Sequence, residues 1–512
     1  MTKRPNILLI VSDQERDRSW IPEGIDLPWR RYLMERGLTF EQHYTHSSPC
    51  SPSRASLFTG RYLANHGVID NVIAPDHHPL STDVPTVGSV LREAGYRSSY
   101  IGKWHLSYGS HPDMEAYGFS DWDGDDRQFM GWAGTGVHFD PIIASNAAHW
   151  LEKNAAPAEG EADEPWFLTV ALVNPHDVMW FPIDQPGYAE RNPDETTFVR
   201  KILSSAAWKD GDPLPIYDQP YAEVVDQLPA NFHDDLFTKP EAHRTWRYEQ
   251  QHGLWGFIDP TDTKSWLRSL DYYVHLHQLA DQSLGTVLQA LKNSGAEEDT
   301  VVLFTSDHGD MCGSHGLRSK GPFVYEEIMH VPMTIVAPGK TTPGSVASTM
   351  STHVDVAATI ASIAGIDPST VTDAEGKPTL QGIDLTPAFA DPSAKLRNHV
   401  LFAQDSAHTD GINAIRYALR GFFDGETKYA RYYGVGGGIP SPGLWGRAQG
   451  TKRFGVDCDF DDQDHEFYNH NTDPLELTNL AYDPARRREV RELYERLRSY
   501  EAVAFDTLTP GI

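Results

Sequence analysis

One stretch of the chain, residues 50–61 (CSPSRASLFTGR), combines a nucleophile with a fixed cation. The pattern predicts a helix with Ser51 as its cap and Gly60 at its end. Cys50 would then lie just ahead of a helix N-terminus, where free N–H groups favour an anion. Arg54, about one turn inside, adds a guanidinium suited to tetrahedral oxyanions. From spacing alone, an ordinary capped helix with a buried cysteine explains the pattern equally well.

Further polar residues each follow a segment that reads as a strand. The carboxyl ends of parallel strands meet at one edge of an open α/β sheet, where ligands bind. We therefore expect these polar groups to converge. They are Asp13 after residues 6–12, Lys103 after 96–101, His176 after 166–173, and Asp307 with His308 after 300–305.

This set of side chains contains the donors of a divalent cation site. Asp13 and Asp307 offer carboxylates, and Gln14 offers an amide oxygen. His308 adds a nitrogen, which favours manganese or another transition ion over calcium. The alternatives are a turn aspartate at position 13 and, at position 14, a donor that only supports the site.

Composition limits the classes of function. The 512 residues carry a net charge of −29, so an acidic surface would repel nucleic acid. No apolar run reaches the ~18 residues of a membrane span. Three cysteines form no disulfide framework, and residues 7–11 are too short for the core of a signal peptide. These features predict a cytoplasmic protein without a membrane or nucleic-acid partner.

The order of apolar runs predicts one large α/β body and a smaller unit. Helices are expected at 28–37, 87–94, 143–153, 265–292, 353–364 and 486–500, and a strand at 331–336. Residues 400–403, 414–420 and 427–431 could form a small antiparallel sheet. We place the catalytic domain at 1–390 and the C-terminal subdomain at 391–512.

Four motifs give the chain a resemblance to a known family. Residues 50–61 resemble the motif of type I sulfatases, in which the cysteine is oxidised to formylglycine (3-oxoalanine) by a maturation enzyme. Residues 102–106 (GKWHL) resemble the Gly-Lys-x-His segment of sulfatases, and 307–311 (DHGDM) the second half of their metal site. Residues 473–480 (DPLELTNL) resemble an element near the family's C-terminus. The resemblance implies an alkaline-phosphatase-like sandwich, with a large, mostly parallel central sheet flanked by helices and a smaller C-terminal α+β subdomain.

The resemblance also implies an arylsulfatase-like enzyme that cleaves a small sulfate monoester to an alcohol or phenol. One cation, Ca²⁺ or Mn²⁺ with Mg²⁺ as a third candidate, would be bound by Asp13, Gln14, Asp307, His308 and the modified Cys50. Arg54 would orient the aldehyde hydrate, and Lys103 and Lys320 would bind the sulfate oxygens. His176 would protonate the leaving alcohol, and His105 would act as the base that expels sulfate. Asn71 stands where a substrate-side Asn is found in related hydrolases.

The sequence departs from the family pattern in ways that leave alternatives open. Gln14 replaces a second Asp, His308 replaces a common Asn, and His176 lacks the usual following proline. These positions are closer to bacterial sulfatases and to phosphonate monoester hydrolases, although the latter tend to lack the Gly-Lys-x-His segment. The rivals are therefore a phosphonate or phosphodiester hydrolase of the same fold, and a non-catalytic anion-binding protein with an unmodified thiol at Cys50.

A long irregular insertion, residues 180–262, leaves the substrate open. Its aromatic residues could stack on an aryl sulfate or enclose choline sulfate, or they could fill a core beneath the insertion. A sugar sulfate is a further alternative. A Gly-rich segment, 434–446, and the C-terminal helix are candidate contacts of a homo-oligomer. The aromatic residues are Trp180, Phe181, Trp208, Tyr217, Tyr221, Trp246 and Trp255.

Overall fold

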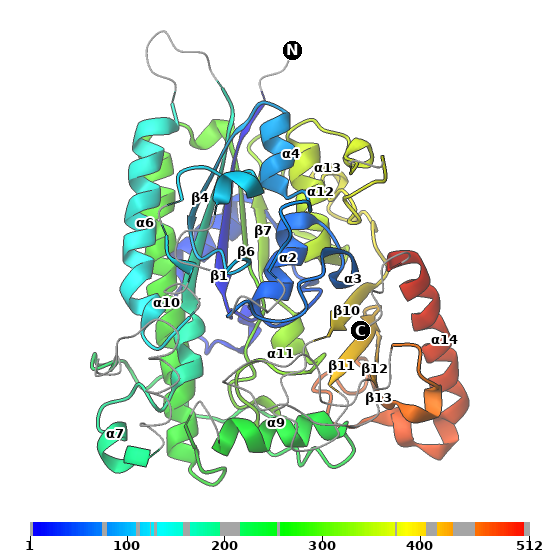
Figure 1. Cartoon of the computed structure of the whole chain (residues 1–512). Helices are drawn as coiled ribbons and strands as arrows, with labels where there is room; N and C mark the ends of the chain where they lie inside the picture. The colour runs from blue at the N-terminus through cyan, green and yellow to red at the C-terminus, as the bar shows by residue number, and fades with distance from the viewer. Residues whose placement is uncertain are drawn as a thin grey trace.

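A seven-stranded sheet forms the centre of the computed structural model (Figure 1). The structure describes residues 4–73, 79–108, 113–122, 124–126, 131–156, 164–194, 216–252, 256–373, 376–405, 417–433 and 456–505. The strand order is β4 (Arg97–Gly102), β5 (Trp166–Pro175), β1 (Asn6–Asp13), β6 (Thr300–Ser306), β7 (Met333–Val336), β2 (Leu38–Phe40) and β8 (Ser345–Ala347).

The pairing of these strands confirms the expected mostly parallel sheet. Strands β4, β5, β1 and β6 are mutually parallel neighbours. Strand β7 runs antiparallel to β6 and β2, whereas β2 and β8 are parallel. A separate parallel pair joins β3 (His43–Tyr44) and β9 (Ser351–Thr352).

Helices cover both faces of the sheet, which explains why residues 7–11 of β1 are all apolar. Ile7, Leu9 and Val11 pack on one face, and Leu8 and Ile10 on the other. The first face carries α2 (Cys50–Thr59), α4 (Val87–Glu93) and α12 (His353–Ile363); the second carries α1 (Pro28–Arg36), α6 (Thr135–Asn154) and α10 (Thr263–Asn293).

A smaller antiparallel sheet follows the main body, as the sequence predicts. It consists of β10 (Val400–Gln404), β11 (Ala418–Phe423), β12 (Thr427–Tyr433) and β13 (Asp464–Asn469) in sequence order. Helix α14 (Arg487–Ala504) packs against this sheet at the edge of the molecule (Figure 1).

Short elements complete the described chain. The remaining α-helices are the single turns α3 (Leu63–His66), α7 (Tyr188–Arg191), α11 (Glu326–Met329) and α13 (Pro387–Ala390), and the longer α9 (Glu241–His252). The 3-10 turns are Arg18–Trp20, Met114–Tyr117, His176–Trp180, Glu297–Asp299, Ser314–Gly316, Pro368–Thr370, Phe460–Asp462, Leu480–Tyr482 and Pro484–Arg486.

Several elements differ from the sequence prediction. Helix α6 begins at Thr135 and not at residue 143, because it accommodates Pro141. Helix α9 was not expected within the insertion, and β13 was not expected at all. The first residues of the strand predicted at 414–420, the Gly-rich segment 434–446, Trp208 and Trp255 lie outside the described residues.

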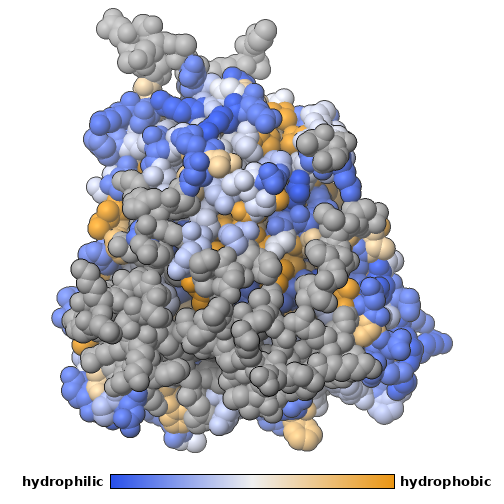
Figure 2. All heavy atoms as spheres, viewed as in Figure 1, coloured by the Kyte–Doolittle hydropathy of each residue, from blue (hydrophilic) through white to orange (hydrophobic). Residues whose placement is uncertain are grey.

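The described residues on the face shown in Figure 2 are mostly hydrophilic, including those at the edge formed by α14. Among the helices that the structure describes, none combines the length and the apolarity that crossing a bilayer requires.

Candidate active site

The four parallel strands bring the predicted polar residues to one edge of the sheet. Asp13 ends β1, Lys103 follows β4, His176 follows β5 and Asp307 follows β6. The strands are neighbours in the order β4-β5-β1-β6, so the four side chains converge as expected.

Helix α2 presents Cys50 to this edge. Cys50 is the first residue of the helix and not the residue ahead of it. The expected cap at Ser51 is wrong: Pro49 precedes the helix, and the Ser51 hydroxyl donates to the His105 carbonyl at 2.5 Å. Gly60 ends the helix in a left-handed conformation, φ 63°, as predicted.

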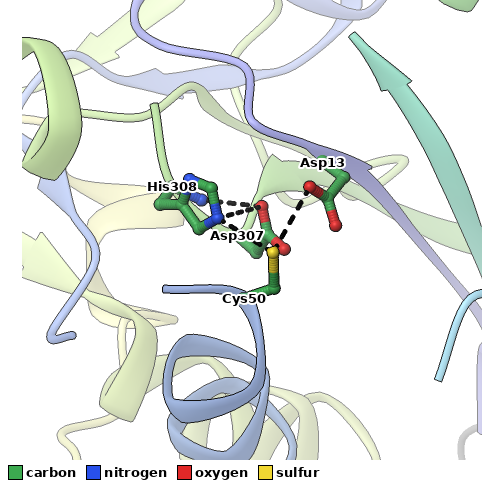
Figure 3. A group of neighbouring side chains, drawn as sticks. All are labelled: Asp13, Cys50, Asp307 and His308. Atoms are coloured by element: carbon green, nitrogen blue, oxygen red, sulfur yellow. Dashed lines mark hydrogen bonds and ion pairs between the residues drawn. The ribbon is translucent and has the colours of Figure 1, made fainter. Parts of the chain in front are cut away.

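Four fully buried side chains form a potential metal site (Figure 3). One donor atom each from Asp13, Cys50, Asp307 and His308 lies within 4.8 Å of the others. His308 Nδ1 is 2.9 Å from the Gly309 carbonyl, which it meets as a donor. The Nε2 lone pair therefore faces the cluster, 3.2 Å from Cys50 Sγ.

The charges of the cluster also fit a cation. Burial and repulsion from Asp13 raise the pKa of Asp307. Burial also opposes ionisation of Asp13, but the charges of Lys103 and Arg54 outweigh it and hold the pKa of Asp13 well below its usual value. Two buried carboxylates with a histidine nitrogen suit a divalent ion, which would relieve their mutual repulsion.

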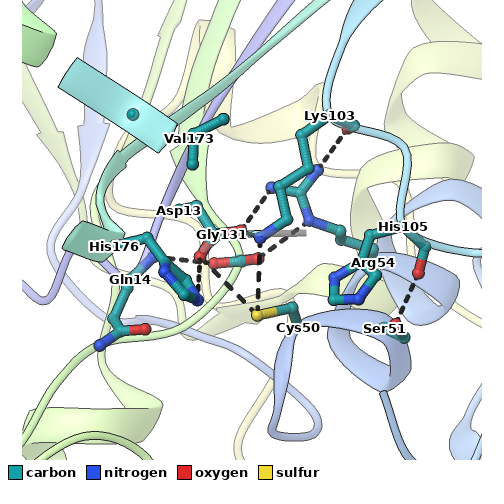
Figure 4. Close-up of polar contacts among 12 residues, drawn as sticks. Asp13, Gln14, Cys50, Ser51, Arg54, Lys103, His105, Gly131, Val173 and His176 are labelled. Carbon is teal, nitrogen blue, oxygen red and sulfur yellow. Dashed lines mark hydrogen bonds and ion pairs between the residues drawn. The ribbon is translucent and has the colours of Figure 1, made fainter. Parts of the chain in front are cut away.

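Two cations hold these carboxylates in place (Figure 4). The Arg54 guanidinium donates to Asp13 Oδ2 at 2.9 Å, to Asp307 Oδ2 at 3.0 Å and to the Lys103 carbonyl at 2.8 Å. The Lys103 ammonium lies 2.7 Å from Asp13 Oδ2 and 3.9 Å from Cys50 Sγ. Burial disfavours the Lys103 charge, but Asp13 more than compensates and raises the pKa of Lys103.

Both predicted catalytic histidines are buried and neutral. Burial and the charges of Lys103 and Arg54 hold the pKa of His105 well below 6.5. Burial and Lys320 do the same to the pKa of His176, whose Nε2 lies 2.9 Å from Lys320 Nζ. Lys320 therefore lies in the same site as His176, which the sequence alone could not show.

Gln14 and Asn71 lie beside the cluster with their amides already engaged. Gln14 Oε1 accepts from Lys320, and its Nε2 donates to Asp310. Asn71 Oδ1 accepts from the Ser51 N–H at 3.0 Å and so supports the start of α2. Metal ligation by Gln14 and substrate binding by Asn71 stay predictions.

The sequence reading missed three residues that shape the site. Gly131 adopts φ 102° and packs on the His176 ring, where a Cβ would lie 2.3 Å from Cε1. Asp126 accepts from the His105 N–H at 2.6 Å. Asp310, which binds Gln14, lies inside the DHGDM motif, but no pattern marked the other two.

A second group of acidic residues lies at the junction with the small sheet. Glu476, from the DPLELTNL motif, meets Lys428 at 2.7 Å and His470 at 3.0 Å, and accepts from the Glu326 N–H at 3.0 Å. A lysine ammonium already neutralises this carboxylate. We read the motif as a structural connection between the main body and the small sheet.

Comparison with known proteins identifies the family. The sequence profile described as Sulfatase matches residues 5–366. The chain belongs to the sulfatase family. This sulfatase is therefore a sulfuric ester hydrolase.

Two curated relatives span nearly the whole sulfatase. N-acetylglucosamine-6-O-sulfatase of Bacteroides thetaiotaomicron is 24% identical over 542 residues, covering 95% of this chain and 90% of the relative. Choline-sulfatase of Rhizobium meliloti is 26% identical over 518 residues, covering 94% and 83%.

A solved structure confirms the fold. The phosphonate monoester hydrolase of Agrobacterium radiobacter superposes with a TM-score of 0.64 at 21% identity, covering 98% of this chain and 96% of its own.

Proposed function

We propose that this sulfatase hydrolyses a small sulfate monoester through a formylglycine made from Cys50. The observation that carries the proposal is the environment of Cys50 Sγ. It lies 3.2 Å from His308 Nε2, 3.7 Å from Asp13 Oδ1 and 3.9 Å from Lys103 Nζ. An aldehyde hydrate at this position would place its oxygens among a potential metal site and an ammonium group.

Asp13, Asp307, His308 and residue 50 would hold one divalent cation, Ca²⁺ or Mn²⁺ with Mg²⁺ as a third candidate. Such an ion supplies Lewis-acid chemistry, lowering the pKa of a hydroxyl and withdrawing charge from a sulfate oxygen. Arg54 orients both carboxylates and favours their charged forms through its separate hydrogen bonds to Asp13 and Asp307.

Lys103 and Lys320 would stabilise the negative charge that develops on the sulfate and on the leaving oxygen. Neutral His176 would deliver a proton to the departing alcohol, and the Lys320 ammonium, hydrogen-bonded to its Nε2, is a source of that proton. His105 would accept the proton of the second hydroxyl. Its pKa, held low by burial and by nearby cations, keeps the imidazole unprotonated for this role.

We infer an arylsulfatase-like preference, with choline sulfate and sugar sulfates as alternatives. Four of the described aromatic residues in the insertion are buried, so they do not form an aromatic cage open to a substrate. Trp180, Phe181, Tyr217 and Trp246 expose at most 7% of their surface. The relatives that act on N-acetylglucosamine sulfate and choline sulfate define the alternative substrates to be compared.

Peptide mass spectrometry of the fragment containing residue 50, from protein made in its native host, tests the nucleophile. The expected result is a carbonyl oxygen in place of sulfur, with loss of two hydrogens. A thiol in fully active protein would overturn the mechanism. A Cys50→Ala variant, expected to lose turnover while keeping its fold, is the matched control.

A substrate panel tests the class of ester. We expect turnover of p-nitrophenyl sulfate to exceed that of a phenyl phosphonate ester, with choline sulfate and glucosamine 6-sulfate measured beside them. Preference for the phosphonate would favour the second candidate function, which rests on the structural likeness to the phosphonate monoester hydrolase.

The cellular setting is part of the same proposal. We propose a cytoplasmic enzyme matured by a formylglycine-generating enzyme. We also propose α14 as the contact of a homo-oligomer, because one of its faces packs on the small sheet while Val503 is 85% exposed.

A further inference from the structure

We propose that Asp126 is a positioning residue that aims His105 at residue 50 for the release of sulfate. The inference rests on the proposed function of His105 and adds a residue that no motif marks. Asp126 is buried, 1% exposed, at the edge of the same site.

The His105 side chain has no polar support of its own. Among the described residues, neither Nδ1 nor Nε2 of this buried ring has a hydrogen-bond partner. A base must nevertheless be held within a fraction of an ångström of its proton donor. The direction of the ring must therefore be fixed through the backbone of residue 105.

That backbone is in an unfavourable conformation. His105 has φ 61°, in the left-handed region that is unfavourable for a residue with a side chain. Trp104, fully buried among aromatic side chains, anchors the preceding residue in the core. A strained residue of this kind persists only where its surroundings hold it.

Two hydrogen bonds hold the His105 backbone, one at its N–H and one at its carbonyl. Asp126 Oδ1 accepts from its N–H at 2.6 Å, and its carbonyl accepts from the Ser51 hydroxyl at 2.5 Å. Ser51 directly follows Cys50 on α2, so this second bond ties His105 to the nucleophile's helix. Asp126 fixes the N–H of the same residue, so the two bonds together set the direction of the His105 ring.

The Asp126 carboxylate has a second, weaker contact that provides an internal control. Its Oδ2 accepts from the Ser107 hydroxyl at 3.3 Å. Ser107→Ala removes that contact and leaves the bond to His105. A purely structural role of Asp126 would make both contacts matter, whereas positioning of His105 requires only the first.

Steady-state and rapid-mixing kinetics with p-nitrophenyl sulfate test the proposal. Asp126→Ala is expected to lower kcat by about 10- to 100-fold, the scale of a misplaced catalytic group, with a smaller change in binding. The first turnover should still release phenol at the wild-type rate, because His105 acts after the phenol departs. Asp126→Asn, which keeps an acceptor oxygen, should recover most of the rate, and Ser107→Ala should match wild type.

Other outcomes distinguish a failure of the positioning role from a failure of the proposed function. Asp126→Ala with wild-type kcat, or equal losses in Asp126→Ala and Ser107→Ala, would overturn the positioning role. Should Asp126→Ala fail to fold, Asp126→Glu, which displaces the carboxylate by one methylene, must show the same slow steady state after a fast first turnover. Wild-type protein that carries formylglycine but does not turn over sulfate esters would contradict the proposed function instead.

Discussion

Lys320 Nζ lies 2.9 Å from His176 Nε2, so the ammonium donates a hydrogen bond to the imidazole. Lysine has no acceptor atom, and the contact therefore requires a neutral ring. Burial and this neighbouring charge together hold the pKa of His176 well below 6.5. The pair stores its proton on lysine and not on histidine.

Lys320→Met should raise the pKa of His176 without restoring its usual value, since burial is the larger cause and is unchanged. Turnover of an aryl sulfate should fall by roughly 100- to 1000-fold, as on loss of a transition-state charge contact. NMR titration of the His176 ring measures the first effect. Lys320→Arg retains the charge and is the control; an identical His176 pKa in Lys320→Met and wild type would contradict the pairing.

Gly131→Ala should impair the same histidine by steric conflict. The new Cβ would lie 2.3 Å from His176 Cε1, and φ 102° disfavours any side chain. We expect kcat to fall by at least about 10-fold through displacement of the ring. Steady-state kinetics with p-nitrophenyl sulfate measures the loss.

Gly365→Ala is the matched control for that variant. Gly365 also has a positive φ, 82°, but no atom lies within 4 Å of its would-be Cβ. It should lose about 1 kcal/mol of stability from backbone strain while retaining wild-type kcat. Equal kcat in both variants would show that Gly131 does not hold His176.

Particular residues show how far the sequence alone could lead. Asp13, Lys103, His176 and Asp307 were predictable together, because each follows a predicted strand and neighbouring parallel strands end at one edge. The contribution of Asp126 could not be predicted, because it depends on a hydrogen bond to His105, 21 positions away in the sequence. The DPLELTNL motif was visible in the sequence, but its role in joining two sheets depends on Lys428 and Glu326, which carry no local signal.

Removal of the divalent cation should destabilise the enzyme, because Asp13 and Asp307 would face each other without it. At an ion concentration of 100 times Kd, binding to the folded state alone contributes about 2.7 kcal/mol. Thermal unfolding in chelator, followed by addition of Ca²⁺, Mn²⁺ or Mg²⁺, measures this contribution and ranks the ions. Asp307→Asn should lose the metal-dependent increase in Tm; an unchanged increase would place the ion elsewhere.

A buried carboxyl away from the catalytic centre gives a separate test through pH. Asp184 accepts from the Tyr272 hydroxyl at 2.9 Å and from Gln185 Nε2 at 2.8 Å. Burial is the main cause that raises its pKa to about 6, from 3.8 in the unfolded chain. The folded state therefore keeps this proton after the unfolded state has released it. As pH rises from about 4 to 6, the ionisation of Asp184 therefore lowers the free energy of unfolding by up to roughly 3 kcal/mol.

Asp184→Asn cannot titrate and should escape that loss. Its free energy of unfolding relative to wild type should therefore shift in favour of the variant as pH rises from about 4 to 6, and level off above that range. Urea unfolding of both proteins at each pH measures the difference, in which the titration of other shared groups cancels. A difference that stays constant across this range would mean that Asp184 releases its proton as readily in the folded as in the unfolded state, and that Tyr272 and Gln185 stabilise its charge as much as burial opposes it.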